Sequence, residues 1–285
     1  NIKTPFREEL LDLFFAISGF IRVAEHYDDS YVTCFEKIKK DVKLKLFCID
    51  PSIQLGNALT RCRAAVFFSA TMTPMEYFKK ILGCDANASG LLLPSPFPGE
   101  NLKLFVYDRI STLYRDRDNT KEQVSQAISS LVSQKTGNYL IFFPSYEYLM
   151  MVFEAFQSDC PDCEVIIQSP GMSENEREEF LNRFGKENHQ SLVGFAVMGG
   201  IFGEGIDLVG NRLSGAVVVG VGLPGISLEK ELIRDYFAGH RNTGFEYAYQ
   251  YPGINRVLQA AGRVIRTETD RGVVLLIDRR YGTHR

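Results

Sequence analysis

The sequence predicts an α/β fold built on a mostly parallel sheet, and two observations carry this prediction. From Ala64 onward, short apolar and β-branched runs alternate with segments of helical periodicity, which is typical of repeated strand–helix–strand units. Most of these runs are apolar at odd and even positions alike, as expected for strands that helices cover on both faces. We expect strands at residues 64–68, 103–107, 139–143, 164–167, 192–197, 215–221 and 272–277.

Helices are expected before and between these strands. An amphipathic helix is predicted near the start of the chain, where apolar residues recur at helical spacing from Phe6 to Ile17. Ser173 followed by Glu176 is the pattern of a capping box and marks the start of another helix. The segment 83–100, rich in Gly, Pro and Ser, predicts a long loop or boundary. After the first helix, the expected helices lie at residues 74–82, 120–134, 146–157, 173–184, 228–238 and 254–265.

The composition is that of a folded globular protein, with 45% hydrophobic and 24% charged residues. A net charge of -3 does not favour a generally basic protein that coats nucleic acid. Six scattered cysteines indicate reduced thiols, and hence a cytoplasmic protein, rather than a disulfide framework. No signal segment or membrane-spanning apolar run is present, so we expect no membrane partner, and the start at Asn1 suggests an excised fragment.

Two stretches place hydroxyl groups directly after expected strands. Ser69 and Thr71 follow the run at 64–68, where they could relay between a phosphate-sensing carboxylate and a neighbouring domain; a simple helix cap is the alternative. Ser145 and Tyr146 follow the run at 139–143. Backbone amides at a helix start beside Ser145 suit a phosphate of a nucleic-acid strand, and the alternative is a cap with a packed aromatic ring.

Two later stretches combine glycine, carboxylate and guanidinium groups. Residues 199–208 contain four glycines, which permit close backbone approach to a ligand, together with Glu204 and Asp207. Arg263 and Arg266 are three residues apart on an expected helix, so they share a face and can point two guanidiniums at a transferring γ-phosphoryl group. The alternative for the two arginines is a solvated or ion-paired helix face.

Together these stretches resemble, in order and spacing, motifs III, IV, V and VI of the XPD/DinG family of superfamily 2 DNA helicases. The segment from Gln259 to Arg280 resembles that family's pattern Q-x-x-G-R-x-I-R-x-x-x-D-x-G-x-x-x-x-x-D-x-R. The resemblance covers residues 44–285 and implies a RecA-like parallel sheet with helices on both faces, the P-loop NTPase-type helicase domain 2. Residues 1–43 are then a helical remnant of a preceding insertion or of the first motor domain.

The resemblance also implies roles for residues on the nucleotide side. Gln259, Arg263 and Arg266 match positions that face ATP between two RecA-like domains, and the two arginines take the part of arginine fingers. Ser69 and Thr71 match the motif that couples hydrolysis to domain movement.

Further roles follow for the nucleic-acid side. Gly205 and Asp207, with Glu204, match a motif that touches the nucleotide cleft and the DNA strand. Ser145 and Tyr146 match the region that lies along single-stranded DNA. Enzymes of the family use Mg-ATP to move 5′ to 3′ on single strands.

The sequence departs from the complete motor pattern in two ways. It has no G-x-x-x-x-G-K-[ST] loop and no D-E-A-H-like stretch, so ATP and Mg²⁺ are expected to be held mainly by a first motor domain, and the chain alone to be inactive. The family's iron–sulfur cluster also belongs to that first domain. The six cysteines lack a four-ligand spacing, and the histidines are isolated, so no metal site is expected here.

Some alternatives remain open at this stage. A RecA-like protein-interaction domain without ATPase activity is one rival, and an RNA helicase motor is another. The aromatic residues 245, 247, 249 and 251, with Phe237, suit stacking on single-stranded bases, but also one face of a short strand or core packing. The pair Cys160 and Cys163 is more typical of two thiols in a loop than of a metal or redox site.

Overall fold

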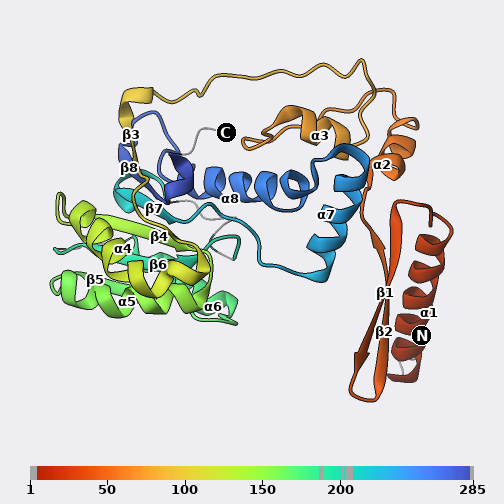
Figure 1. The fold of residues 1–285 in the computed structure, drawn as a ribbon, viewed down its shortest axis with the longest axis horizontal. Coiled ribbons are helices and arrows are strands. Elements are labelled where there is room, and N and C mark those ends of the chain that lie inside the picture. Colours follow the sequence, from red (N-terminus) through yellow and green to blue (C-terminus); the bar gives the residue numbers. More distant parts are fainter. Residues whose placement is uncertain (1–4, 186–188, 201, 203–207, 283–285) are drawn as a thin grey trace. The chain divides into compact units, whose positions relative to one another are not determined.

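The computed structural model describes residues 5–185, 189–200, 202 and 208–282 (Figure 1). The chain groups into two compact units. Residues 1–90 and 226–248 form the first, here named the helix–hairpin unit, and residues 91–225 and 249–285 form the second, the α/β unit. The boundary expected between residues 43 and 44 falls inside strand β2 (Asp41–Cys48) of the first unit.

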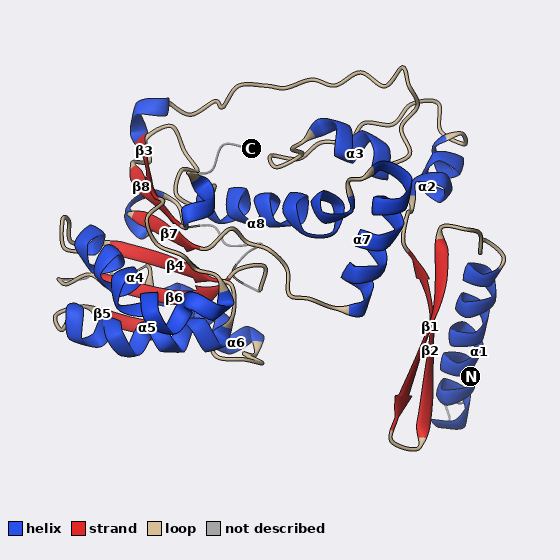
Figure 2. Cartoon of the chain, viewed as in Figure 1, coloured by secondary structure: helices blue, strands red, loops and turns tan. Residues whose placement is uncertain are grey.

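The α/β unit contains a six-stranded sheet in which every pairing is parallel (Figure 2). The predicted parallel sheet is therefore confirmed, and the strands expected at 164–167, 192–197 and 272–277 have the predicted bounds. From one edge to the other the strands are β3 (Leu102–Tyr107), β8 (Gly272–Ile277), β7 (Gly215–Val219), β4 (Asn138–Phe143), β6 (Leu192–Val197) and β5 (Glu164–Ile167).

Helices cover both faces of this sheet, as predicted. Helices α4 (Arg117–Val132) and α5 (Tyr146–Asp159) pack on one face, and α6 (Glu174–Arg183) and α8 (Tyr251–Ala261) contribute to the apolar cluster on the other. Every residue of β4 is buried, because that strand lies inside the sheet beneath both helical layers. The predicted capping box at the start of α6 is confirmed.

Two glycines allow α8 to pack closely against the segment that follows β7. Gly222 has a φ of +69°, and a side-chain carbon there would lie 2.5 Å from the carbonyl oxygen of Gly253 on α8. A side-chain carbon on Gly253 would in turn lie 2.9 Å from the carbonyl oxygen of Val221. Helix α8 ends at Ala261, with Gly262 as its C-cap, so the prediction of a helix reaching residue 265 was wrong.

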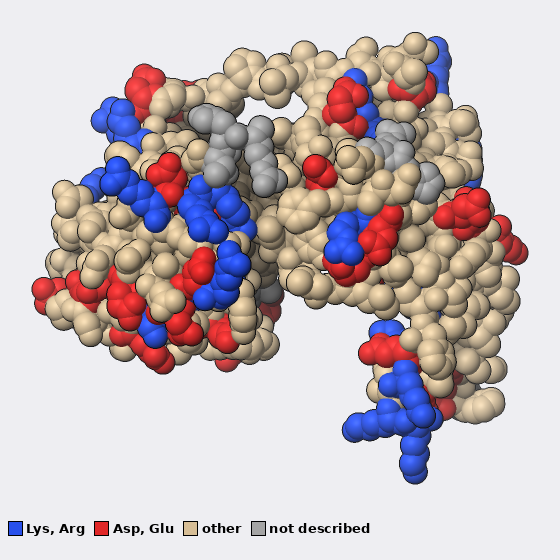
Figure 3. All heavy atoms as spheres, viewed as in Figure 1, with Lys and Arg blue, Asp and Glu red and all other residues tan. Residues whose placement is uncertain are grey.

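The helix–hairpin unit contains several helices and an antiparallel hairpin that the sequence did not predict. Lysines 37, 39, 40 and 43 surround the hairpin turn, and Figure 3 shows basic side chains gathered at its tip. Only part of residues 1–43 is therefore helical. The elements of this unit are α1 (Pro5–Ala24), β1 (Tyr31–Ile38), β2, α2 (Ser52–Leu59), α3 (Met75–Ile81) and α7 (Leu228–Arg241). A π-helical turn (Glu246–Gln250) begins in this unit and ends in the α/β unit.

The strand expected at residues 64–68 is not formed. This segment is extended coil, with Val66 84% and Phe68 89% exposed. A strand requires a partner for its backbone groups, and none of the described strands pairs with this segment. An apolar run is thus not sufficient for a strand here.

Tyr247, in the helical turn before α8, packs against aromatic rings of two other helices. The ring of Tyr247 stacks on Phe237 with centroids 4.2 Å apart and meets Tyr77 of α3 edge-on at 4.9 Å. Core packing of Phe237 and Tyr247 is confirmed, whereas a short strand at 245–251 was wrong. The alternating aromatic spacing fitted a strand, but the backbone adopts a π-helical turn instead.

The cysteine prediction was partly wrong. Cys160 and Cys163 form a disulfide across the turn after α5, where their Cα atoms are 5.5 Å apart, within the usual span of such a bond. The other four cysteines are free thiols. No group of metal-ligating side chains is found in the described part of the chain, and none of its described helices combines the length and apolarity needed to cross a bilayer.

Candidate nucleic-acid and nucleotide sites

The first candidate site lies where β4 ends and α5 begins. Ser145 is the N-cap of α5, and its hydroxyl accepts a hydrogen bond from the backbone N–H of Tyr148 at 3.3 Å. The capping alternative for Ser145 is therefore correct. Capping does not exclude a binding role, because the remaining amides of the first turn and the helix dipole still favour an anion at this end.

Arg117, which the sequence prediction missed, lies beside this helix start. Its Nη1 donates to the Ser145 hydroxyl at 3.4 Å, and its Nε donates to the backbone oxygen of Thr112 at 3.4 Å. The guanidinium carbon lies 4.5 Å from the ring centre of Tyr148 and 5.4 Å from that of Tyr114. The side chain is thus held in place by rings and neutral oxygens.

The charge of Arg117 has no carboxylate partner among the described residues within ion-pairing distance. Burial lowers the pKa of Arg117, and the nearby Arg280 guanidinium lowers it further, whereas the rings and Glu147 act in the opposite sense. A half-buried cation with neutral partners is poorly compensated, and an anion beside Ser145 would stabilise it.

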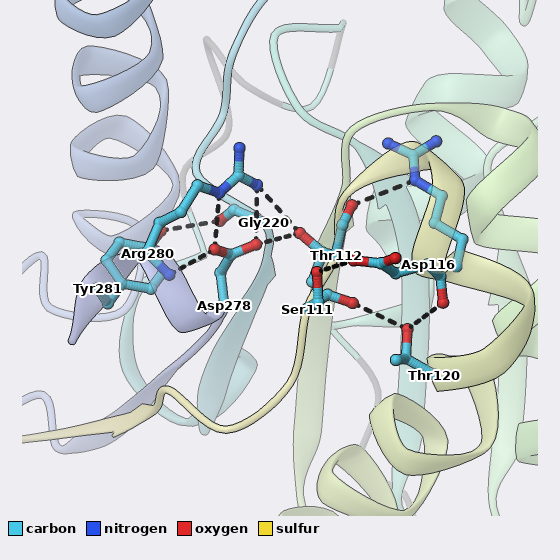
Figure 4. A network of polar contacts seen from close by, with 9 residues as sticks. Ser111, Thr112, Asp116, Thr120, Gly220, Asp278, Arg280 and Tyr281 are labelled. Carbon is cyan, nitrogen blue, oxygen red and sulfur yellow. Dashed lines mark hydrogen bonds and ion pairs between the residues drawn. The ribbon is translucent and has the colours of Figure 1, made fainter. Parts of the chain in front are cut away.

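A buried network fixes the segment that carries Arg117 (Figure 4). The carboxylate of Asp278, directly after β8, is fully buried and accepts from Nε and Nη2 of Arg280 at 2.7 and 2.8 Å. It also accepts from the hydroxyl of Thr112, and Arg280 donates to the same hydroxyl at 3.2 Å. Burial alone raises the pKa of Asp278, but these hydrogen bonds and the guanidinium hold it below its usual range.

The second predicted DNA residue, Tyr146, is tied to two neighbouring strands. Its hydroxyl accepts from the side-chain amide of Gln168 at 2.8 Å, and the amide oxygen of Gln168 accepts from the backbone N–H of Val197 at 2.8 Å. Burial raises the pKa of Tyr146, so its phenol stays protonated at neutral pH. Ser145 and Tyr146 are thus brought together at the carboxyl edge of the sheet.

The predicted nucleotide residues lie elsewhere in the α/β unit. Gln259 is half-buried on α8, Arg263 is half-buried in the turn after α8, and Arg266 is exposed in the following loop. The two arginines do not share a helix face as expected, because the helix ends before both of them. The two arginines lie in the segment that leads into the amino end of β8. Ser145 and Tyr146 lie at the carboxyl edge of the sheet, so the structure does not bring the two pairs together.

A buried carboxylate shapes the loop that carries Arg266. Asp270 accepts from the backbone N–H groups of Arg266 and Thr267, both at 2.8 Å, and from that of Gly210 at 3.0 Å. Burial raises the pKa of Asp270 by itself, but the hydroxyl and amide donors around it keep the pKa below its usual range. The backbone of Arg266 is therefore fixed by an ionised side chain.

Residues 128–285 of the chain match the family model described as the helicase C-terminal domain, which is more than half of the chain. The chain belongs to this helicase family. The resemblance to XPD/DinG-type C-terminal helicase domains found in the sequence is confirmed at the level of family and fold.

Curated relatives of this helicase domain include complete helicases. The ATP-dependent DNA helicase CHL1 of Debaryomyces hansenii is 25% identical, covering 95% of this chain and 36% of the relative. A probable ATP-dependent helicase of Methanocaldococcus jannaschii is 28% identical, covering 79% of this chain and 35% of the relative. The chain thus spans about a third of the length of these relatives.

Solved structures support the fold of the helicase domain. Two XPD structures, one of them an apo form, superpose with TM-scores of 0.67 at 20% and 21% identity. They cover 94% and 95% of this chain, and this chain covers 54% and 46% of them. The predicted RecA-like fold with helices on both faces of a parallel sheet is confirmed.

One group of predicted residues lies outside the residues that the structure describes, and another lies before the region that the family model matches. Glu204, Gly205 and Asp207 lie outside the described residues. Ser69 and Thr71 precede the matched family region and lie in the helix–hairpin unit, where the Ser69 hydroxyl accepts from the backbone N–H of Thr71 at 3.2 Å. Both hydroxyl residues belong to a local turn that follows the extended segment 64–68.

Arg117 illustrates what the sequence prediction could not find. The run Arg115-Asp116-Arg117-Asp118 is typical of a solvated helix start, and the expected helix began only at residue 120. Asp278 and Arg280 were within the quoted family pattern, but the pattern does not say that they reach Thr112, which is 166 residues away from Asp278 in sequence.

Proposed function

We propose that this helicase domain is the C-terminal motor half of an ATP-dependent DNA helicase that translocates 5′ to 3′ on single-stranded DNA in the cytoplasm. Arg263 and Arg266 act as arginine fingers towards ATP, which with Mg²⁺ is held mainly by the first motor domain of the same parent. An iron–sulfur cluster, where the parent has one, belongs to that first domain. The observation that carries the proposal is the half-buried Arg117, which has no ion-pairing carboxylate among the described residues, beside the capped start of α5 in a domain of a helicase family.

The DNA side of the proposal rests on the surroundings of Ser145. A phosphate placed beside Ser145 would receive donors from Arg117 and from the first turn of α5, and it would compensate the half-buried guanidinium. In the view of Figure 3, acidic side chains gather over α5 and α6, while basic ones gather above them on the same unit. A strand following the basic side would avoid the acidic one.

The nucleotide side rests on the loop after α8. Arg266 is exposed while its backbone is fixed by Asp270, and Gln259 and Arg263 precede it on the same connection. Exposed and half-buried guanidiniums on a fixed backbone fit the charge of a nucleotide phosphate, so the residues present fit ATP. Bound Mg-ATP supplies the phosphoryl group whose transfer drives movement, and we propose that Glu204, Gly205 and Asp207 also take part in nucleotide binding.

Coupling to the first motor domain is proposed for Ser69 and Thr71. The apolar segment 64–68 just before them is exposed, with Val66 and Phe68 more than 80% accessible. Side chains of this kind are usually buried, which supports contact with a further domain of the parent. We therefore propose that this segment adjoins the first motor domain, and that residues 1–43 are a remnant of a preceding insertion or of the first motor domain itself.

The arginine-finger assignment is tested by Arg263→Ala in the intact parent. Loss of one guanidinium aimed at a transferring phosphoryl group lowers turnover by about 10³-fold or more. DNA-stimulated ATPase activity should therefore fall to background, while circular dichroism and DNA affinity stay close to wild type. Arg183→Ala, which changes an arginine of α6 outside every predicted motif, is the matched control and should retain activity.

Unchanged turnover in Arg263→Ala would remove the arginine-finger assignment. Absence of ATPase activity in the intact wild-type parent would favour a RecA-like protein-interaction domain instead. Equal stimulation by DNA and RNA strands, or preference for RNA, would favour an RNA helicase.

The DNA site is tested by Arg117→Ala in the same parent. Loss of one phosphate contact should weaken single-strand affinity at low salt and reduce the slope of log affinity against log salt by roughly 0.7. Fluorescence anisotropy with a labelled oligothymidylate at several salt concentrations measures both quantities. Lys121→Ala, on the same helix but paired with Asp118, is the control, and an unchanged slope in Arg117→Ala would exclude the phosphate contact.

A further inference from the structure

The outer edge of β3 carries none of the residues that the proposed motor function assigns to ATP or DNA. β3 is an edge strand of the sheet and pairs only with β8 among the described strands. Its residues Leu104, Phe105 and Val106 are 59%, 54% and 49% exposed. The backbone groups along the outer side of such a strand are available for pairing with a further strand.

A pocket of about 560 Å³ opens beneath the amino half of this strand. Lys103 and Phe105 alternate along β3, so they point to the same face, and both line the pocket. Its lining includes the apolar or aromatic side chains of Phe105, Leu131, Tyr139 and Val273. A volume in this range accommodates a large side chain or a small ligand.

The charged residues of the pocket lining, here named the rim, are predominantly basic. Lys103, Lys135 and Arg271 contribute three cations, against the single carboxylate of Glu100. No ion pair involves these three cations in the described part of the chain. The rim is anchored, because the side-chain amide of Asn101, just before β3, donates to the backbone oxygen of Glu268 at 3.0 Å.

We propose that this edge binds an acidic, extended segment of a partner protein, which adds a strand beside β3 and inserts one apolar side chain into the pocket. Main-chain hydrogen bonds to β3 supply affinity, and the pocket and its rim select an apolar residue flanked by Asp or Glu. A nucleic-acid strand fits less well, because it cannot pair with a strand edge and the pocket lining is largely apolar, with Phe105 as its exposed ring.

The experiment selects binders to the intact chain from a phage-displayed library of random peptides. Selected peptides should carry acidic residues around one large apolar residue, and their binding should protect the amides of β3 in hydrogen exchange. A version of the best peptide with N-methylated backbone should lose affinity. In Lys103→Glu combined with Arg271→Glu the affinity should fall by about tenfold or more.

Lys121→Glu on α4, outside the pocket, is the matched control and should bind the peptide as wild type does. Circular dichroism of each variant confirms that the fold is retained, and the N-methylated peptide tests strand addition without any change to the protein. Failure to select peptides, selection of peptides without acidic residues, or protection away from β3 would overturn the proposal. Displacement of the peptide by oligothymidylate or ATP would also overturn it, and would assign the pocket to the motor site instead.

Discussion

The two units of the chain differ in where they place their apolar side chains. In the α/β unit, strands such as β4 and β7 are buried over their whole length, and both large apolar clusters lie in this unit. In the helix–hairpin unit, Phe14 of α1 and Phe35 of β1 are 60% and 67% exposed. The α/β unit therefore has its own hydrophobic core, whereas the described part of the other unit leaves much apolar surface uncovered.

The largest expected effect on the free energy of unfolding comes from truncating one large side chain in the core of the α/β unit. Phe195 of β6 is fully buried and stacks on Phe143 with centroids 5.3 Å apart, so Phe195→Ala should lower the free energy of unfolding by about 3–5 kcal/mol. Phe68→Ala makes the same change at an 89% exposed side chain and should cost less than about 0.5 kcal/mol. Urea unfolding followed by circular dichroism measures both, and equal losses would contradict the contrast between the units.

A smaller loss is expected from a buried polar contact of the α/β unit. Asp278→Asn removes the charge that pairs with Arg280, and we expect a cost of about 2 kcal/mol, below that of a fully buried pair because Arg280 is 31% exposed. Asp278→Glu, which keeps the charge, separates the loss of charge from a change in shape.

The pH dependence of the same contact has a definite sign. The pKa of Asp278 is lower in the folded chain than the unfolded value of about 3.9, so its stabilisation is fully present above that value and is lost as pH falls through the folded-state pKa. Acid titration should therefore destabilise the wild type more than Asp278→Asn. Parallel acid profiles for the two proteins would contradict the assignment.

The smallest effect concerns an exposed contact of the helix–hairpin unit. Lys45 of β2 donates to Glu229 of α7 at 2.9 Å, and this hydrogen bond, with a backbone contact of Glu229, holds the pKa of Glu229 at about 2. Lys45→Ala should raise that pKa towards its ordinary value, as followed by carboxyl-carbon NMR. Lys43→Ala, two residues away on the same strand, should leave it unchanged; an unmoved pKa in Lys45→Ala would show that hairpin and α7 do not meet in solution.

The same contrast explains how far the sequence could predict the fold. Strands β5, β6 and β8 were predicted with correct bounds because each of their apolar runs pairs with a neighbouring strand of the parallel sheet. The run at 64–68 has the same composition, but no described strand pairs with it. The hairpin β1–β2 was missed because its lysine-rich, exposed residues show no buried face that alternation could reveal.

For the candidate sites, too, the sequence predicted only the features that a local pattern determines. Ser145 and Tyr146 could be placed at a strand end from the pattern alone, because a buried run followed by a capping residue fixes that geometry. The end of α8 was predicted too late, so the expected helical alignment of Arg263 and Arg266 was wrong. Arg117 could not be found, because its significance depends on Ser145 and Tyr148, which are far away in sequence.

Asp270 gives the loop before β8 a property that matters when a ligand arrives. One of its oxygens accepts a hydrogen bond from the backbone N–H of Gly210, and the other accepts from those of Arg266 and Thr267. One side chain therefore holds together two segments that are distant in sequence. The main chain of Arg266 is therefore ordered during folding. An anion that binds Arg266 has to immobilise only the side chain of this residue. Because the loop backbone is already ordered, the affinity for the anion is not reduced by the entropic cost of ordering the loop.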